Sequence, residues 1–494
     1  MIDDTEKPST LFSQRLSTAV ELRKSGVDPY PANVPRTHTN RDLQASQSSL
    51  EVGGETSDRA AVAGRVMSMR NSGMFVDIFD GTDKMQLYFD VTSDAAPWRS
   101  FLRSVDLGDF IAAAGTVRRT KRGELTLQVD DAQIATKALR PPPEKFHGIA
   151  DVELRYRKRY LDLIGNVDSR RKLVTRSKLI GAIRQFLTDR GFSEFETPML
   201  QTIYGGASAR PFSTHHNALG LKLFLRIAPE LYLKRLVVGG VSDKVFELNR
   251  NFRNEGISTR HNPEFTMLEV YQAYADYSDM LLLLENLVAT ALQDATGSTI
   301  VEIDGHTADF GKPFNRLSMV DEASASIDLD FRTAHDLVEL RRKVSRALGC
   351  DVGVSVSWGE LVEMVFERKV EAALVAPTHV LDFPADISPL AKRNLADPRL
   401  ADRFETYAFG MEIANAFSEM NDPVAQRDIF VAQVASAHSR GEFENVVDED
   451  YLEALEYGLP PTGGLGLGID RLAMIATGSS SIRDVIAFPT MRPI

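Results

Sequence analysis

Polar and apolar residues alternate along two neighbouring segments of the chain, residues 245–255 and 265–271, which flank a charged loop. A period of two predicts a strand in each segment. In the first strand the polar residues share one face: Glu247, Asn249, Asn251, Arg253 and Glu255. In the second strand one face combines aromatic and acidic residues: Phe265, Glu269 and Tyr271. The pattern indicates either two strands with a common polar working face or an amphipathic hairpin whose polar face is solvated.

A third segment, residues 462–475, places glycine at every second position: Gly464, Gly466 and Gly468. A strand loses packing and backbone entropy with each glycine, so three in register indicate close approach by a ligand or another backbone. A helical pattern then begins at Asp470 and Arg471. The spacing matches neither the dinucleotide nor the phosphate-loop motif. Together with Arg253, suited to phosphate, and Phe265, suited to stacking on a purine, it nevertheless favours a nucleotide site.

The pattern changes along the chain in a way that predicts several domains. Residues 1–55 suggest a helical and irregular extension, and residues 56–139 contain short strands with turn signals, which predict a small barrel. A proline-rich linker is expected within 140–165. Residues 166–494 mix antiparallel strand patterns with helices, which favours the α+β class, and a helical insertion is expected at about 278–375.

Composition is that of an ordinary globular, multidomain protein: 494 residues, 43% hydrophobic and 26% charged. The N-terminus lacks the pattern of a signal peptide, and no apolar run approaches the roughly 18 residues of a membrane span, so we expect a cytoplasmic protein without membrane contact. The single cysteine, Cys350, excludes an internal disulfide. A net charge of −12 does not favour a nucleic-acid binder. The basic group at 118–122 suits either a phosphate contact or a solvated turn.

Three ordered motifs make the chain resemble the class II aminoacyl-tRNA synthetases from about residue 60 to the C-terminus. The motifs are GFSEFETPML at 191–200, which contains Pro198, FRNEGISTRHNPEF at 252–265 and GLGLGIDRL at 464–472. Further segments are similar to the bacterial lysine-specific branch: GGASARPF at 205–212, APELYLKRL at 228–236, EIANAFSEMND at 412–422 and the ending IRDVIAFPTMRP.

The resemblance implies an N-terminal OB-fold barrel that reads the anticodon, followed by an antiparallel catalytic sheet flanked by helices. It implies an ATP-dependent and Mg²⁺-dependent ligase that joins L-lysine to tRNA(Lys), acting as a homodimer through its first motif. Two alternatives stay open. One is a ligase that attaches a lysine-type amino acid to a protein such as an elongation factor, and the other is a non-catalytic, synthetase-like regulatory protein.

The resemblance also assigns roles to individual residues. Arg253 and Arg471 would be catalytic, and the ATP site would comprise Arg253, Glu255, Arg260, His261, Phe265, Glu405 and Arg471. Glu405 and Glu412 would hold magnesium, although simple alternation puts Glu412 on the face opposite Asn415, so a twist or bulge is required there. Hard carboxylate oxygens bridged to phosphate suit this ion.

Lysine selectivity needs an acidic slot, because a buried unpaired ammonium is costly. The family's lysine-contacting positions correspond to Gly206, Glu230, Glu269, Tyr271, Asn415, Phe417 and Glu419. The chain departs from the family pattern nearby, at Met411, Ala414 and Ala416. In the barrel the anticodon contacts correspond to Phe75, Gln86 and Glu124. Without the resemblance, Phe75 is interpreted as a core residue.

Overall fold

The computed structural model describes residues 10–92, 98–143, 149–207, 209–334, 336–439 and 446–493. It divides into two compact units, Met1–Ala150 and Asp151–Ile494, and each is described by itself. Parts of the segments singled out above lie outside the described residues: positions 1–9 of the N-terminal extension, 93–97 of the barrel, 144–148 of the linker, Ser208 within 205–212, 335 of the insertion, and 440–445 and 494 of the C-terminal region.

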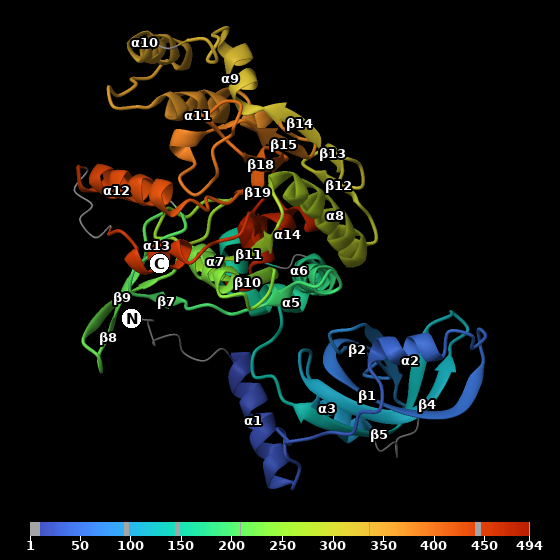
Figure 1. The fold of residues 1–494 in the computed structure, drawn as a ribbon. Coiled ribbons are helices and arrows are strands. Elements are labelled where there is room, and N and C mark those ends of the chain that lie inside the picture. Colours follow the sequence, from blue (N-terminus) through green and yellow to red (C-terminus); the bar gives the residue numbers. More distant parts are fainter. Residues whose placement is uncertain are drawn as a thin grey trace. The chain divides into compact units, whose positions relative to one another are not determined.

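Five strands of the first unit close into a barrel, as the sequence predicts (Figure 1). They are β1 (Glu55–Arg70), β2 (Phe75–Phe79), β3 (Lys84–Tyr88), β4 (Phe110–Arg119) and β5 (Leu125–Thr136). Their order is β1-β2-β3-β5-β4, with β1 also paired to β4. Only β3 and β5 run parallel among these pairs. Alternate apolar residues such as Val66, Ile78 and Leu127 fill the interior.

Three helices accompany the barrel: α1 (Thr10–Lys24), α2 (Asn40–Ser46) and α3 (Trp98–Ser104). The α1 helix is tied to the chain that follows β5, because Arg15 Nη1 donates to the carbonyls of Ala138 and Arg140. Thr39 caps α2 by accepting from the Asp42 N–H. Leu102 of α3 belongs to the barrel core.

The second unit is built on an eight-stranded sheet of order β14-β15-β18-β19-β20-β11-β10-β6. The strands are β6 (Ser193–Glu194), β10 (Lys244–Phe252), β11 (Glu264–Ala273), β14 (Asn315–Ser318), β15 (Thr378–Leu381), β18 (Arg403–Ala408), β19 (Met411–Ser418) and β20 (Thr462–Gly468). The sheet is antiparallel at its centre, and its two edge pairs, β6–β10 and β14–β15, are parallel. The α+β class and the antiparallel centre are therefore confirmed.

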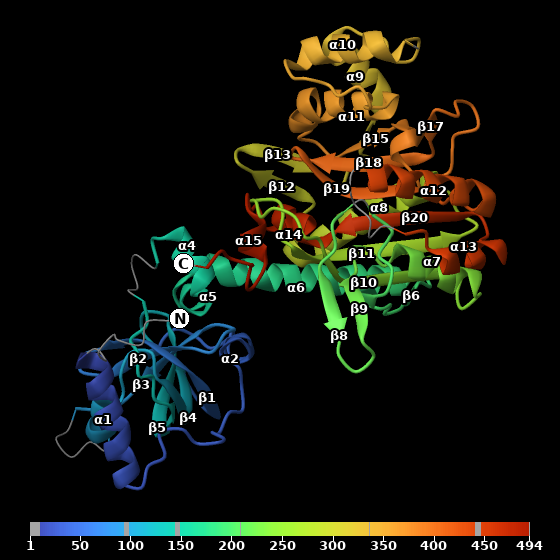
Figure 2. The same cartoon turned by 90° about the vertical axis from the view of Figure 1, so that its left-hand side faces the viewer.

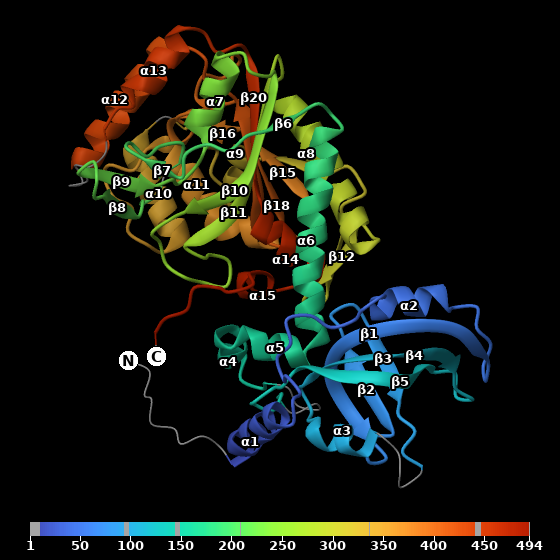
Figure 3. The ribbon, with the colours of Figure 1, turned by 90° about the horizontal axis from the view of Figure 1, so that it is seen from below.

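Helices α6 (Val167–Thr188), α8 (Tyr277–Thr296) and α14 (Ile469–Thr477) cover one face of this sheet, where α6 runs alongside the strands (Figure 3). They pack on the apolar sides of the strands, including Phe246, Leu268 and Leu467. At the opposite side lie α7 (Glu230–Val238), α12 (Pro423–Ser439) and α13 (Glu449–Glu456) (Figure 1). Tyr271 packs there with residues of α7 and α13.

The span expected as a helical insertion, 278–375, contains both helices and strands. Most of α8 falls within it and belongs to the main helical layer. A hairpin of β12 (Ile300–Ile303) and β13 (His306–Asp309) and the edge strand β14 come next. Helices α9 (Met319–Ile327), α10 (Leu337–Leu348) and α11 (Trp358–Lys369) then gather beyond the β14–β15 edge around a separate apolar cluster (Figure 2).

The remaining elements of the second unit are short. They are α4 (Val152–Arg157), α5 (Arg159–Gly165), α15 (Ile482–Val485), the sheet of β7 (Leu200–Gln201), β8 (Ser213–His216) and β9 (Leu221–Leu225), and the pair β16 (Phe383–Pro384) and β17 (Leu400–Ala401). Within the described parts of the chain, no helix is both long and apolar enough to cross a membrane.

Candidate active site

One face of the large sheet carries polar residues from neighbouring strands. Directly paired residues of antiparallel strands point to the same side, so the pairs Glu247–Glu269 and Glu269–Gly466 bring β10, β11 and β20 together on that face. The helices cover the other face, as the alternation predicts. The polar face is not solvated, because Glu247 and Glu269 are only 1% and 4% exposed. The solvated-hairpin alternative is therefore wrong.

An acidic slot lies at one end of this face, where α7 meets the sheet. Three buried carboxylates from separate elements contribute to it: Glu230, Glu269 and Glu419. Tyr271 donates its hydroxyl to Glu269 Oε2 at 3.0 Å. Gly206 lies against the slot, and a β-carbon there would sit 3.0 Å from the Glu230 Cβ. The acidic positions that the sequence singled out are therefore brought together.

The slot also contains a cation that the sequence analysis missed. Lys234, one turn after Glu230 on α7, is completely buried, and its Nζ lies 2.5 Å from Glu230 Oε1. It also forms an ion pair with Glu419. The spacing of four residues between Glu230 and Lys234 is a helical pairing signal that was available in the sequence.

Beneath the slot, Glu247 is matched by a buried partner. Arg226 Nη1 donates to Glu247 Oε1 at 2.7 Å, and both side chains are 1% exposed. Thr197 donates to the other oxygen, Glu247 Oε2. Burying one charge of such a pair alone is strongly unfavourable. The complete pair therefore holds β10 against the segment that contains Arg226. Glu247 thus has a protein counter-charge, whereas Glu269 has none within hydrogen-bonding distance in the described structure.

Burial governs the protonation of the slot. It raises the pKa of Glu269 to about 8, and the negative charge of Glu230 adds to the effect. It also raises the pKa of Glu419 well above the usual range, against the opposing influence of the Lys234 ammonium. The slot therefore resists holding all its carboxylates ionised unless cations enter it.

Gly464 leaves the space that the Glu419 carboxylate occupies. A β-carbon built at this position would lie 1.8 Å from Glu419 Oε1 and 2.9 Å from Tyr271 Cε1. Any larger residue would therefore displace the acid or the ring. At Gly466, by contrast, the nearest atom to a β-carbon would be the flexible end of Met267, at 3.1 Å, followed by the Asn415 carbonyl oxygen at 3.7 Å. At Gly464 the close approach is therefore made by a side chain of the slot, whereas the glycine pattern led us to expect a ligand or another backbone.

The centre of the face presents an arginine beside an aromatic ring. The Arg253 guanidinium carbon lies 5.1 Å from the centre of the Phe265 ring. Its Nε is buried and has no hydrogen-bond partner in the described structure. A buried donor without an acceptor is costly, and an anionic ligand would satisfy it. Glu255 lies two residues further along and is exposed to solvent.

Beyond Arg253, a second arginine is held by two neighbours. Arg471 Nη1 donates to Glu412 Oε2 at 3.1 Å, and Nη2 donates to His261 Nε2 at 3.2 Å. Since Arg471 can only donate, His261 must be neutral, with its proton on Nδ1, which lies 2.9 Å from Ser258 Oγ. Burial and the Arg471 charge lower the pKa of His261, in agreement. Arg260 Nη1 donates to the Gly410 carbonyl at 2.7 Å.

A β-bulge brings Glu412 onto the working face. The register of β18 and β19 shifts between Thr406 and Tyr407: Thr406 pairs with Ala414, whereas Tyr407 pairs with Glu412. Ile413 is the extra residue, and it packs in the core. The bulge that alternation required is therefore present.

Glu405 lies on the same face of the sheet and accepts hydrogen bonds from two neighbours. Arg403 Nη2 and the Tyr407 hydroxyl each donate to it at 2.5 Å. Burial raises its pKa to about 7, and Glu412 is the next largest influence. Arg403 also donates through Nε to Asn415 Oδ1 at 3.0 Å. Asn415 thus contacts this group, and the described structure gives it no hydrogen bond to the acidic slot.

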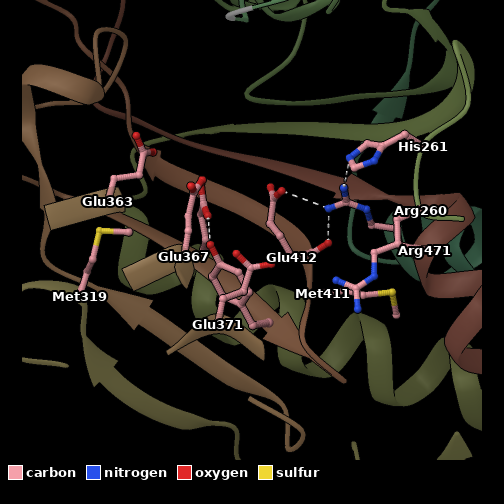
Figure 4. Close-up of a pocket in the computed structure, with 11 residues that line it drawn as sticks. Arg260, His261, Met319, Glu363, Glu367, Glu371, Met411, Glu412 and Arg471 are labelled. Carbon is pink, nitrogen blue, oxygen red and sulfur yellow. Dashed lines mark hydrogen bonds and ion pairs between the residues drawn. The ribbon is translucent and has the colours of Figure 1, made fainter. Parts of the chain in front are cut away.

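A cavity of about 380 Å³ opens between these groups and the α11 helix (Figure 4). Its lining combines arginine and histidine with carboxylates, and Glu412 lies next to Arg471: Arg260, His261, Arg471, Glu363, Glu367, Glu371, Glu405 and Glu412. No three histidine, cysteine or acidic side chains of the described chain converge as metal ligands. A cation here would therefore need ligands from a bound anion in addition to Glu405 and Glu412.

The barrel residues assigned by resemblance lie on β2, on β3 and in the turn before β5. Phe75 is half-buried and packs on Tyr88, with ring centres 5.4 Å apart. The guanidinium carbon of Arg118 lies 4.3 Å from the centre of the Tyr88 ring. Gln86 is 8% exposed, and its Oε1 accepts from Thr126. Glu124 forms an exposed ion pair with Lys84 at 2.7 Å. Within the basic group at 118–122, Arg119 is bound to three carbonyls of the unit itself.

Comparison with known proteins covers both units. Residues 151–492 match the family described as tRNA synthetases class II (D, K and N), and residues 60–135 match the OB-fold nucleic acid binding domain. The chain is 51% identical over 471 residues to a lysine–tRNA ligase of Sinorhizobium medicae, covering 95% of this chain and 94% of that protein. Lysine–tRNA ligases of Agrobacterium fabrum and Pelotomaculum thermopropionicum are each 49% identical over 99% of this chain.

Proposed function

The chain belongs to the class II tRNA synthetase family for aspartate, lysine and asparagine, and from this premise we propose that it is a lysine–tRNA ligase. It activates L-lysine with ATP and transfers it to tRNA(Lys). The observation that carries the choice of amino acid is the buried slot of Glu230, Glu269 and Glu419. Of the three amino acids only lysine brings a side-chain cation, and carboxylates are the partners that a buried ammonium needs.

Activation is an in-line displacement at phosphorus. A carboxylate oxygen of lysine bonds to the α-phosphorus of ATP while the bond to the β-phosphate oxygen breaks, giving lysyl-adenylate and pyrophosphate. Arg253, with its unsatisfied Nε, contacts the α-phosphate and the lysine carboxylate, where negative charge develops. Phe265 stacks on adenine. Catalysis on this face consists mainly of positioning the reacting groups and of holding arginine cations in place before the reaction begins.

The cluster around Arg471 suits the outer phosphates. Arg471, Arg260 and neutral His261 supply donors at one wall of the cavity, and all three line it (Figure 4). Glu412, which Arg471 contacts, and Glu405 would hold Mg²⁺ at this cavity. The ion would supply positive charge to neutralise the leaving pyrophosphate. Glu255 lies at the solvent side of the same ATP site.

The slot holds the amino acid by its two amino groups. Glu230 and Glu269 face one ammonium group, and Glu419 and Tyr271 face the other, while Phe417 lies along the methylene chain. Gly206 lines the entrance. Asn415 acts indirectly, because Arg403 binds it and joins it to Glu405. Ala414 and Ala416 are buried in the helix-side core, so the departures from the family pattern at these positions leave the slot itself unchanged.

The barrel and the catalytic unit together favour tRNA over the other acceptors. A ligase that modifies a protein, or a regulatory relative, would not require an anticodon reader, and this chain has a closed OB-fold barrel. Arg253 and Arg471 are both present, as catalysis requires. We further propose that the protein works in the cytoplasm as a homodimer that joins through the segment at 191–200.

Pyrophosphate exchange with each of the twenty amino acids tests this proposal. Exchange of labelled pyrophosphate into ATP should depend on lysine, and aspartate, asparagine and arginine should not support it. Charging of a tRNA(Lys) transcript by the same preparation then tests the acceptor. Faster exchange with aspartate or asparagine than with lysine would overturn the specificity and leave the family assignment standing.

Lysine affinity should rise between pH 6 and pH 8. Glu269 has a pKa of about 8 in the free protein and must be ionised to face an ammonium, so binding below that pH releases a proton. The Michaelis constant for lysine should therefore fall as pH increases, by up to about tenfold per unit. Glu269→Gln should make the profile less steep, although Glu419, whose pKa is also raised, still contributes. A flat profile in the unmodified protein would contradict the assignment. Burial also raises the pKa of Glu405, in the ATP site, to about 7. The Michaelis constant for ATP is therefore measured separately at each pH.

Replacing Phe75 by alanine should weaken tRNA charging and spare lysine activation. Stacking of a base on an aromatic ring contributes about 1 to 3 kcal/mol, or roughly 5- to 150-fold in the Michaelis constant for tRNA. Phe75→Tyr keeps a ring and serves as the control. Gln86→Ala should act in the same direction. Normal charging by both alanine variants at limiting tRNA would show that the anticodon contacts lie elsewhere.

A further inference from the structure

Lys234 places an ammonium inside the slot that takes the lysine substrate. Its side chain has 0% exposure and reaches two of the three carboxylates, Glu230 and Glu419. Aromatic rings flank the charge as well: Nζ lies 5.6 Å from the ring centre of Phe417 and 5.9 Å from that of Tyr271. Carboxylates with aromatic faces are what a buried ammonium prefers, so one such position is already filled by the chain itself.

A count of charges shows what this ammonium does. The slot has three carboxylates, since Glu247 is already matched by Arg226 at 2.7 Å. Lysine brings two ammonium groups, and its carboxylate faces Arg253. Two ammonium groups leave one carboxylate unmatched, and Lys234 supplies the missing positive charge. Without it, the loaded slot would hold an excess negative charge at a fully buried place, and such a charge is costly.

We propose that Lys234 is a positioning and specificity-determining residue, which neutralises one of three carboxylates so that the remaining charge of the slot matches a ligand with two ammonium groups. This inference rests on the proposed function and deepens it. Lys234 contacts both Glu230 and Glu419 and fixes where their oxygens lie. A ligand with one ammonium leaves a buried carboxylate unpaired and is rejected for that reason.

Lys234→Met tests the proposal, because methionine keeps most of the unbranched side chain and removes its charge. At pH 7.5 the Michaelis constant for lysine in pyrophosphate exchange should rise at least about tenfold, with that for ATP changed less than about twofold. The control is Arg235→Met on the same helix. Arg235 pairs outside the slot with Asp448 and Asp450, so its loss should leave the constant for lysine unchanged.

A double variant separates charge balance from a merely structural role. Lys234→Met combined with Glu230→Gln leaves two carboxylates for two ammonium groups. Charge balance predicts that the double variant binds lysine at least as well as Glu230→Gln alone, so the two losses are not additive. A structural role predicts additive losses. This comparison also stands if Lys234→Met alone does not fold, since the empty slot of the double variant has the same net charge as that of the unmodified protein.

Two results would overturn the inference. One is an unchanged Michaelis constant for lysine in folded Lys234→Met. The other is a double variant whose constant exceeds that of Glu230→Gln by tenfold or more, as additive losses require. Either outcome counts only when the unmodified protein shows lysine-dependent exchange. Absence of that exchange would instead mean that the proposed function has failed.

Discussion

Replacing Arg253 by alanine should lower the rate of adenylate formation more than about a hundredfold while the protein stays folded. The guanidinium packs on Phe265, and its buried Nε has no partner in the described structure, so it stands ready for an anion. Removing one such preorganised donor typically costs about 10²- to 10³-fold in rate, because the contact strengthens as charge develops in the transition state. Lysine-dependent pyrophosphate exchange measures the loss.

Arg250→Ala provides the matched control for this experiment. Arg250 lies in β10, three residues before Arg253, and alternation directs its side chain to the other face, near Glu264 at 3.7 Å. Its loss should change exchange less than about threefold, since partly exposed ion pairs contribute little. Arg253→Lys keeps the charge and loses the paired donors, so we expect an intermediate rate. Exchange by Arg253→Ala within threefold of the unmodified rate would remove Arg253 from the mechanism.

The parts of the site that could be predicted from the sequence follow from local periodicity. Alternation in residues 245–255 assigned Glu247 and Phe246 to opposite faces, and the structure buries Phe246 under the helices and turns Glu247 to the slot. The glycines of β20 likewise left space for a neighbour, which is the Glu419 carboxylate. A period of two is imposed by the backbone of each strand, so it needs no knowledge of the rest of the fold.

The parts that could not be predicted depend on pairing between distant segments. Alternation required a twist or bulge near Glu412, but the place of the bulge, at Ile413, is set by a one-residue slip of β19 against β18. The parallel edge pairs also come from packing beyond the strands themselves. Motif resemblance supplied Glu405 and Glu412 without explaining how both could face one cavity.

Lys234 was missed for a different reason. Its sequence neighbours predict a helix, and a lysine four residues after a glutamate is ordinarily a surface pair of small energetic value. Only the packing of α7 against β11, α13 and the end of β19 shows that the pair is buried. Charged residues are rarely buried without partners, so a lysine inside an apolar helix pattern is a signal worth testing in other chains.

Replacing Glu419 by glutamine should raise the Michaelis constant for lysine by at least about tenfold and leave that for ATP nearly unchanged. The change keeps the shape of the side chain, which lies over Gly464, and removes one negative charge that faces an ammonium. Charge-assisted hydrogen bonds are roughly twice as strong as neutral ones. The loss should be larger than for a surface acid, because the Glu419 side chain is completely buried and water cannot replace it.

The same substitution distinguishes this role from one in folding. Lys234 keeps Glu230 as a counter-charge in Glu419→Gln, and the empty slot loses one of its excess negative charges, so the melting temperature should not fall. Glu153→Gln, which breaks an exposed pair with Arg157, is the control and should change neither constant. If Glu419→Gln loses stability but keeps its Michaelis constant for lysine, then Glu419 serves only to hold Lys234, and the ammonium of the substrate must lie against Glu230 and Glu269 instead.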